Sequence, residues 1–227
     1  MDKRIKAVTF DKEAHKYFYN GKELRGVTGA IGKLMRKSFP DTVLVQAATI
    51  YGHDVHSESE LWIKEGKEPS SEAGKWVVQY LKEFQIKHNV VKYEAELLVS
   101  DFIGTASCID IVAHLADGNS LLFDIKTTSH FDRAYCSLQL SVYKKLYEAC
   151  YGGNVCGLFV LGTKSRRTFR IIEQEAGKVQ KILDMNKNDW VSNSRSNGSV
   201  NCAADYMEGG LNYGKDKMIL RFRKYWM

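Results

Sequence analysis

The fold is decided by residues 121–126, Leu121-Leu122-Phe123-Asp124-Ile125-Lys126, in which three apolar residues run directly into an Asp-x-Lys triplet. A short apolar run of this kind is typical of a buried strand. Side chains alternate along a strand, so Asp124 and Lys126 share one face while Ile125 points into the core. The Ile125 carbonyl can still turn toward the shared face. A surface ion pair would explain the two charges equally well on an exposed strand, but next to a buried run it would be costly.

A second strand precedes this one and pairs with it. Residues 102–115 and 121–127 flank the turn Ala116-Asp117-Gly118-Asn119, which predicts a hairpin. If the turn holds three residues, or two plus a bulge, Asp110 on the first arm faces Asp124 on the second, with Cβ atoms about 5 Å apart. Two carboxylates at that distance repel by roughly 3 kcal/mol at an effective dielectric constant near 20. A Mg²⁺ or Mn²⁺ ion between them would offset this repulsion. An isolated Asp pair more often caps a turn, and it is Lys126 on the same face that favours a metal site.

The remaining chain alternates strand and helix patterns. The dipeptide Asn20-Gly21 is a hairpin signal after the apolar run at 16–19. We expect further strands at 5–10, 90–100, 155–161 and 168–173, and helices at 28–37, 42–64, from 71, 132–150 and 176–190. This order predicts an α/β fold with a central mixed β-sheet flanked by helices. We expect one domain over 1–227, with an N-terminal hairpin and helix (1–40), a catalytic core (41–190) and a loop with a basic tail (191–227).

Composition narrows the class of protein. The chain has 227 residues and a net charge of +6, with basic residues clustered at 164–170. This excess fits a polyanionic partner such as nucleic acid, although ordinary surface lysines fit as well. Five cysteines without a CxxC pair indicate reduced thiols, not a zinc ribbon or a disulfide framework. No apolar run suggests a signal peptide or a membrane span, so we expect a cytoplasmic protein with no membrane partner.

Two helices and one further strand supply candidate partners for the acids. His56 follows Gly52 by one helical turn, and the glycine would let that helix approach a neighbour closely. A lone helical histidine is usually just a polar residue, but a His ligand here would favour Mn²⁺ over Mg²⁺. Glu94 and Glu96 share one strand face, and we favour Glu96 as the further acidic ligand.

Candidate DNA contacts lie on and near the helix at 132–150. Gln139 and Tyr143 are four residues apart and share one face, where Gln139 could hold the attacking water or a phosphate oxygen. An ordinary amphipathic helix explains this pair equally well. Phe131 and Tyr135 could stack unpaired bases. We expect DNA contacts from one tyrosine and three arginines: Tyr143, Arg133, Arg166 and Arg167.

Four motifs in order resemble the PD-(D/E)XK nuclease superfamily, and most closely its RecB-like, phage-type exonuclease branch. They are Gly52-His53-Asp54-Val55-His56, Cys108-Ile109-Asp110-Ile111-Val112, Phe123-Asp124-Ile125-Lys126-Thr127-Thr128 and Gln139-Leu140-Ser141-Val142-Tyr143. Residues 15–18 and 26–28 also resemble the leader of phage-type members. The resemblance covers roughly 15–173 and implies a restriction-endonuclease-like core.

The resemblance also implies roles. The metal would be bound by His56, Asp110, Asp124 and the Ile125 carbonyl, Lys126 would be catalytic, and Gln139 and Tyr143 would place DNA. Hydrolysis would use one or two metal ions and no covalent enzyme intermediate. Family members usually carry a glycine about three residues before the first Asp, where this chain has Ser107 and its nearest glycine is Gly104. Of the five cysteines only Cys202 lies near the C-terminus, so we expect no iron–sulfur cluster.

These patterns predict a metal-dependent DNA exonuclease that processes DNA ends during recombination or repair of a phage or mobile element. The alternatives are a structure-specific endonuclease of the same superfamily and a catalytically inactive DNA-binding module. The DNA ends could be single- or double-stranded. Further partners could be copies of the chain itself, as in a ring-shaped oligomer, or a single-strand annealing protein. No Gly-rich phosphate loop of the GxxxxGK type occurs, which disfavours a nucleotide-binding role.

Overall fold

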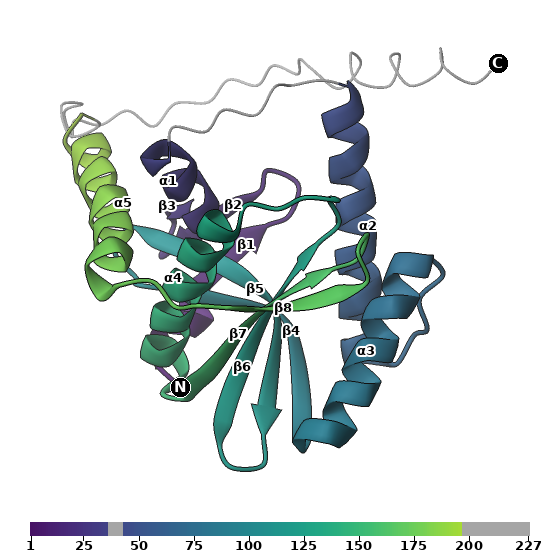
Figure 1. The fold of residues 1–227 in the computed structure, drawn as a ribbon. Coiled ribbons are helices and arrows are strands. Elements are labelled where there is room, and N and C mark those ends of the chain that lie inside the picture. The colour runs from purple at the N-terminus through teal and green to yellow at the C-terminus, as the bar shows by residue number, and fades with distance from the viewer. Residues whose placement is uncertain (36–42, 197–227) are drawn as a thin grey trace, which may run out of the picture.

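The computed structural model describes residues 1–35 and 43–196. Within these residues, groups of strands and groups of helices follow one another and form one mixed eight-stranded sheet with five α-helices and a short 3-10 helix (Figure 1). The elements are η1 (Lys3–Ala7), β1 (Val8–Asp11), β2 (Lys16–Tyr19), β3 (Lys22–Gly26), α1 (Val27–Leu34), α2 (Val43–Glu65), α3 (Glu72–His88), β4 (Val90–Ser100), β5 (Thr105–Leu115), β6 (Asn119–Lys126), α4 (Arg133–Tyr151), β7 (Asn154–Gly162), β8 (Arg167–Ile171) and α5 (Ala176–Ser196). This confirms the predicted α/β class with a mixed sheet.

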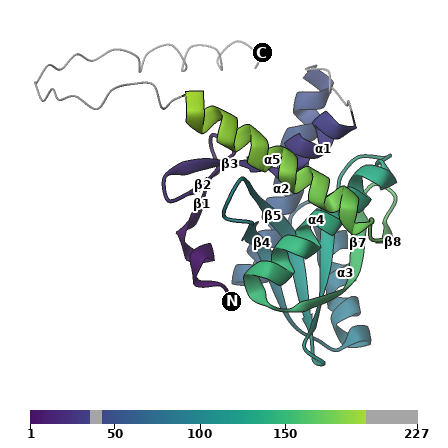
Figure 2. The same cartoon turned by 90° about the vertical axis from the view of Figure 1, so that its left-hand side faces the viewer.

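Helices cover both faces of the sheet, and the side-chain alternation of β6 shows how. Leu121, Phe123 and Ile125 belong to a buried cluster with α2 and α3, whereas Leu122 belongs to a larger cluster with α1, α4 and α5. Figure 2 shows α4 and α5 lying across one side of the sheet. Asp124 is two residues from Leu122, so the two side chains lie on the same face of β6. The Asp124 carboxylate therefore lies on the α4 side, toward the helix that contains Gln139.

The sheet forks at β5. One edge of β5 pairs with β4 along nearly its whole length. The other edge pairs antiparallel with β6 through Ile111–His114 and parallel with β3 through Thr105–Ala106. Among the described strands, residues 107–110 of β5 have no neighbour on that second edge. The fork leaves Asp110 at an opening of the sheet, where its side chain can meet groups from β6, α2 and α4.

Three element boundaries differ from the sequence prediction, and side-chain hydrogen bonds explain two of them. Residues 3–7 form a 3-10 helix instead of the start of a strand, because the Asp2 carboxylate accepts the Arg4 N–H. The strand predicted from residue 102 starts at Thr105, because the Asp101 carboxylate accepts the N–H groups of residues 103–105. α5 continues to Ser196, so residues 192–196 are helix and not loop. The predicted basic tail lies outside the described residues.

Glycines at two positions allow a close approach or a tight turn. A Cβ on Gly104 would lie 2.9 Å from the α5 backbone at Lys187, so this glycine lets α5 cross the loop before β5. The predicted hairpin turn at Asn20-Gly21 joins β2 to β3 and has positive φ at both residues, 49° and 76°. No helix in the described ranges is long and apolar enough to span a membrane.

Candidate active site

Three acids lie side by side on three neighbouring strands. The register of β4 with β5 puts Glu96 opposite Asp110. The register of β5 with β6, continued by one residue, puts Asp110 opposite Asp124. Glu96 has a φ of 51°, a left-handed conformation that costs a non-glycine residue about 1–3 kcal/mol and is concentrated at functional sites. The sheet therefore holds a row of carboxylates at its fork.

His56 reaches this row from α2. Its Nδ1 lies 3.5 Å from Asp110 Oδ2, and its Nε2 lies 3.2 Å from the Ile125 carbonyl oxygen. Ligand atoms of His56, Glu96 and Asp110 all lie within 4.8 Å of one another. A Cβ on Gly52 would lie 3.2 Å from Thr127 Oγ1, so the glycine lets α2 pass close to the end of β6, as the sequence suggested.

Lys126 connects the acid row to α4. Its Nζ lies 2.7 Å from Asp124 Oδ2 and donates to Gln139 Oε1 at 3.3 Å. Gln139 Nε2 in turn donates to the Tyr143 hydroxyl at 2.9 Å, and Ser107 Oγ donates to the same hydroxyl at 3.2 Å. This chain of hydrogen bonds fixes the direction in which the lysine ammonium points.

Burial and mutual charge shift the pKa values of the row. Burial raises the pKa of Glu96 to about 7, and the Asp110 charge adds to this. Burial opposes protonation of His56, but Asp110, Asp124 and Glu96 outweigh it and raise the His56 pKa to about 9. Burial likewise raises the pKa of Asp124, although Lys126 opposes the change. The carboxylates of Asp124 and Asp110 hold the pKa of Lys126 above its usual range despite burial. Lys126 therefore stays protonated. The carboxylates of the row favour the binding of a cation.

Two observations test whether a divalent cation fits. Asp124 is 2% exposed, and its Oδ2 accepts no hydrogen bond although Lys126 Nζ is close, because the geometry is out of line. Asp110 accepts one hydrogen bond from the Ile125 N–H at 2.7 Å, which leaves further lone pairs for a ligand. Carboxylate oxygens with one imidazole are a donor set that suits Mg²⁺ and Mn²⁺. The residues present fit such an ion.

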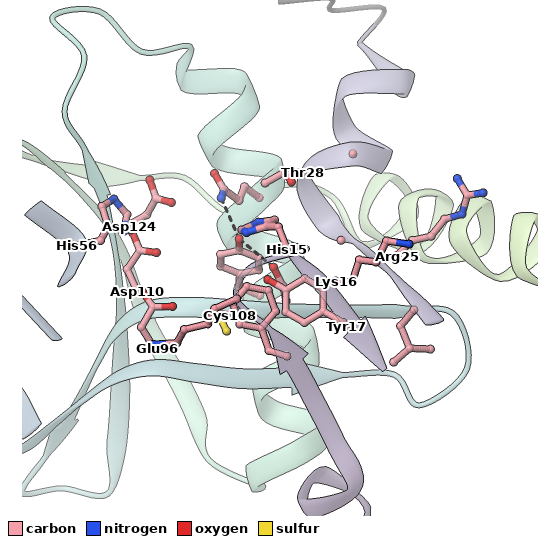
Figure 3. A pocket seen from close by; sticks show the side chains of 18 of the residues that line it. His15, Lys16, Tyr17, Arg25, Thr28, His56, Glu96, Cys108, Asp110 and Asp124 are labelled. Carbon is pink, nitrogen blue, oxygen red and sulfur yellow. Dashed lines mark hydrogen bonds and ion pairs between the residues drawn. The ribbon is translucent and has the colours of Figure 1, made fainter. Parts of the chain in front are cut away.

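The cluster opens into a cavity of about 1280 Å³. Figure 3 shows His56, Asp110 and Asp124 on one side of it and His15, Lys16 and Tyr17 of the N-terminal hairpin on the other. Lys126, Gln139 and Tyr143 also line it. The fork in the sheet thus forms one wall of a large pocket that is lined by both the acids and the N-terminal strands.

Two predicted contacts are refined by the structure. Glu94 binds His114 at 2.8 Å and Lys92 at 2.6 Å, and it does not line the pocket, whereas Glu96 does. Tyr143 lines the pocket but is 3% exposed, so it offers little surface to DNA, and its hydroxyl supports Gln139 instead.

The predicted aromatic contacts Phe131 and Tyr135 and the three predicted arginine contacts do not line the pocket. Phe131 packs edge-on against Phe169, the Tyr135 hydroxyl donates to the Thr28 carbonyl, and neither residue lines the pocket. The three arginines do not line the pocket: Arg133 stacks on Phe169, Arg166 pairs with Glu72 at 3.5 Å, and Arg167 is exposed on β8.

Sequence reasoning missed the part of the site that comes from the N-terminal hairpin. Phe10, His15 and Tyr17 line the pocket together with Lys16 and Arg25. The available signal is the mixture of rings and lysines at 15–19, which local pattern alone interprets as a strand. The parallel pairing of β3 with β5, which brings this hairpin to the site, joins segments about 80 residues apart and leaves no local mark in the sequence.

Comparison with known proteins gives fold neighbours of low similarity. The sequence matches no protein-family profile and no curated protein. One similar solved structure is a Eubacterium rectale protein provisionally described as an exonuclease, with 11% identity, a TM-score of 0.41, and coverage of 78% of this chain and 83% of the other. Another is the alkaline exonuclease LHK-Exo of Laribacter hongkongensis, with 11% identity, a TM-score of 0.38, and coverage of 77% and 93%. At this level of similarity, neither neighbour assigns an activity to this chain.

Proposed function

We propose that this chain is a metal-dependent deoxyribonuclease that hydrolyses phosphodiester bonds in the pocket at the fork of the sheet. The observation that supports this most is the convergence of Glu96, Asp110 and His56 within 4.8 Å, beside a half-buried lysine that is paired with Asp124. Asp124 completes the acidic row because it lies opposite Asp110 on β6. The resemblance of four sequence motifs to the PD-(D/E)XK nucleases supports the same chemistry.

The residues have separable roles in this proposal. Glu96, Asp110, Asp124, His56 and the Ile125 carbonyl would hold Mg²⁺ or Mn²⁺. The ion would polarise the scissile phosphate and lower the pKa of a bound water. Lys126 supplies a fixed positive charge to the phosphate oxygens as negative charge develops on them, and its direction is already set. Gln139 holds the ammonium in place, and Tyr143 holds Gln139.

We further propose that the enzyme acts as an exonuclease on DNA ends, in recombination or repair of a phage or mobile element. The pocket is lined on several sides by β2, β3, α1, α2 and α4, which suits a strand end better than a continuous duplex. A structure-specific endonuclease would use the same cluster. Digestion of a linear duplex and of the same DNA as a closed circle separates the two, because an exonuclease leaves the circle intact.

The proposal is tested with end-labelled single- and double-stranded DNA incubated with Mg²⁺, Mn²⁺ or EDTA. We expect nucleotide release with either metal and none in EDTA. Activity that persists in EDTA would contradict the metal-dependent mechanism. Tight DNA binding without cleavage under every condition would make the chain a binding module instead.

A further inference from the structure

The N-terminal hairpin places three rings that contact one another on the wall of the pocket. The Phe10 and Tyr17 rings are stacked with centroids 4.6 Å apart, and His15 meets Phe10 edge-on at 5.2 Å. Tyr17 is 6% exposed, Phe10 is half-buried and His15 is exposed, so the group runs from the core to the solvent. All three side chains line the cavity that contains Asp110 and Asp124.

The hairpin holds these rings in place without a ligand. The Asp11 carboxylate accepts the N–H groups of Glu13 and Ala14 at 3.0 and 2.9 Å and so fixes the loop between β1 and β2. His15 ends this loop with a φ of 52°, a conformation that histidine tolerates better than most residues. A surface that is ordered before binding loses little conformational entropy when a ligand stacks on it.

Cations surround the rings. Lys12 pairs with Glu60 at 3.6 Å and Lys16 with Glu23 at 2.8 Å, and both lysines are exposed. Exposed pairs of this kind contribute little to stability, so exchanging the acid for a phosphate costs little. The cationic side chains of the hairpin and α1 that line the pocket are Lys12, Lys16, Lys22, Arg25 and Lys33. Proteins bind single-stranded nucleic acid with aromatic rings that stack on the bases and with cationic side chains that contact the phosphate backbone.

The ring wall is continuous with the acid row. Tyr17, Ser107 and Cys108 all line the cavity. Cys108 precedes Asp110 by two residues on β5 and shares its strand face. A strand whose bases stack on Phe10 or His15 would therefore run along β2 toward the carboxylates.

We propose that this wall, formed by Phe10, His15 and Tyr17 with their neighbouring lysines, binds unpaired bases, so that the substrate is single-stranded DNA or a single-stranded tail. The inference rests on the proposed nuclease function and specifies its substrate class. Bases within a duplex already stack on their neighbours, so the rings favour a strand with free base faces.

The test measures binding in EDTA, where the proposed reaction does not proceed. Fluorescence anisotropy compares a labelled oligothymidine with a blunt-ended hairpin duplex. The variant Phe10→Leu/His15→Asn removes both outer rings while keeping an apolar side chain at 10 and a residue that tolerates positive φ at 15. His88→Asn is the matched control, because His88 is exposed, stacks on Phe84 and does not line the pocket.

We expect the unmodified protein to bind oligothymidine more tightly than the duplex. The double variant should bind oligothymidine about 5- to 150-fold more weakly, the loss of at least one base stack, with duplex binding unchanged. His88→Asn should behave like the unmodified protein. Equal affinity for duplex and single strand, or a double variant that binds oligothymidine normally, overturns the inference. Because no metal is present, these results do not depend on cleavage, and failure of the nuclease proposal would show separately as DNA binding without digestion in Mg²⁺ or Mn²⁺.

Discussion

At the scale of single residues, the site depends on one lysine held between acids and an amide. Lys126 lies 2.7 Å from Asp124 and 3.3 Å from Gln139, and Asp124 is 2% exposed. Neither charge would be stable alone at that depth, since an unpaired buried charge is strongly destabilising. The ion pair therefore stabilises both charges next to the proposed position of the scissile phosphate.

Lys126→Gln should lose turnover but keep substrate binding. The amide fills a similar volume and can still donate to Asp124, but it carries no charge to stabilise the transition state. Removing one such group typically lowers kcat by about 10²–10³-fold. Steady-state kinetics on labelled DNA, with anisotropy for binding, would measure both. Lys92→Gln is the control, because Lys92 pairs with Glu94 outside the pocket. A Lys126→Gln enzyme with full kcat would remove the lysine from the mechanism.

Metal affinity should rise with pH. The pKa of Glu96 is raised to about 7 by burial and Asp110, and that of His56 to about 9 by its three acidic neighbours against the effect of burial. Both groups bind a cation when deprotonated, so the metal must displace their protons. At pH 7 we expect release of about one to two protons per ion, falling below about one above pH 9.

Calorimetric titration of Mn²⁺ in buffers of different ionisation enthalpy counts these protons. His56→Gln should release about one proton fewer at pH 7. Heats that are the same in every buffer at pH 7 would show that the two groups are not ligands.

At the scale of elements, the approach of α2 to the end of β6 positions His56. The contact is made by Gly52, whose added Cβ would lie 3.2 Å from Thr127 Oγ1. Val55, in the same turn of α2, is fully buried and belongs to the hydrophobic cluster between the sheet and the helices α2 and α3. A small outward shift of this helix would move the imidazole away from Asp110.

Gly52→Ala should leave stability nearly unchanged but reduce activity. Alanine favours the helix by about 1 kcal/mol, and the tight contact offsets this gain. Displacing His56 by a few tenths of an ångström should lower kcat/KM by up to about tenfold, since a displacement of about 1 Å can cost about 100-fold. Adding Thr127→Ala removes the contacting oxygen and should restore activity, with Thr127→Ala alone as the control. A double variant as impaired as Gly52→Ala would show that the contact is not the cause.

Local pattern predicted the elements that carry their own signals. The apolar run before Asp124 and the turn at 116–119 placed β5, β6 and the facing acids correctly, because alternation and turn chemistry are local. The sequence favours Glu96 over Glu94 as a ligand but does not decide between them, since both share one strand face. The difference comes from the fork: Glu96 lies opposite Asp110, whereas Glu94 is paired with Val112 and turned to His114.

At the scale of the whole molecule, the N-terminal segment closes one side of the pocket. Leu24, Val27 and Ile31 belong to the same buried cluster as Ile109 of β5 and Leu140 of α4. We therefore propose that the hairpin, α1 and the core unfold together as one domain. The site would then form only when the segments before and after α2 are folded against each other.

Thermal unfolding should show one transition that Mn²⁺ raises. At an ion concentration about 100 times Kd, binding stabilises the folded state by about 2.7 kcal/mol. For a chain of this size that corresponds to roughly 5–10 °C in Tm. Asp110→Asn should lose most of the shift. Two separate transitions would contradict the single domain, and an equal shift in Asp110→Asn would locate the ion elsewhere.

The central claim is that acids from three neighbouring strands converge on one divalent ion, and anomalous diffraction from crystals soaked in Mn²⁺ tests it most directly. We predict a manganese peak in the pocket bonded to carboxylate oxygens of Glu96 and Asp110. A soaked crystal with no peak at this position, or with its manganese bound only elsewhere, would contradict the account.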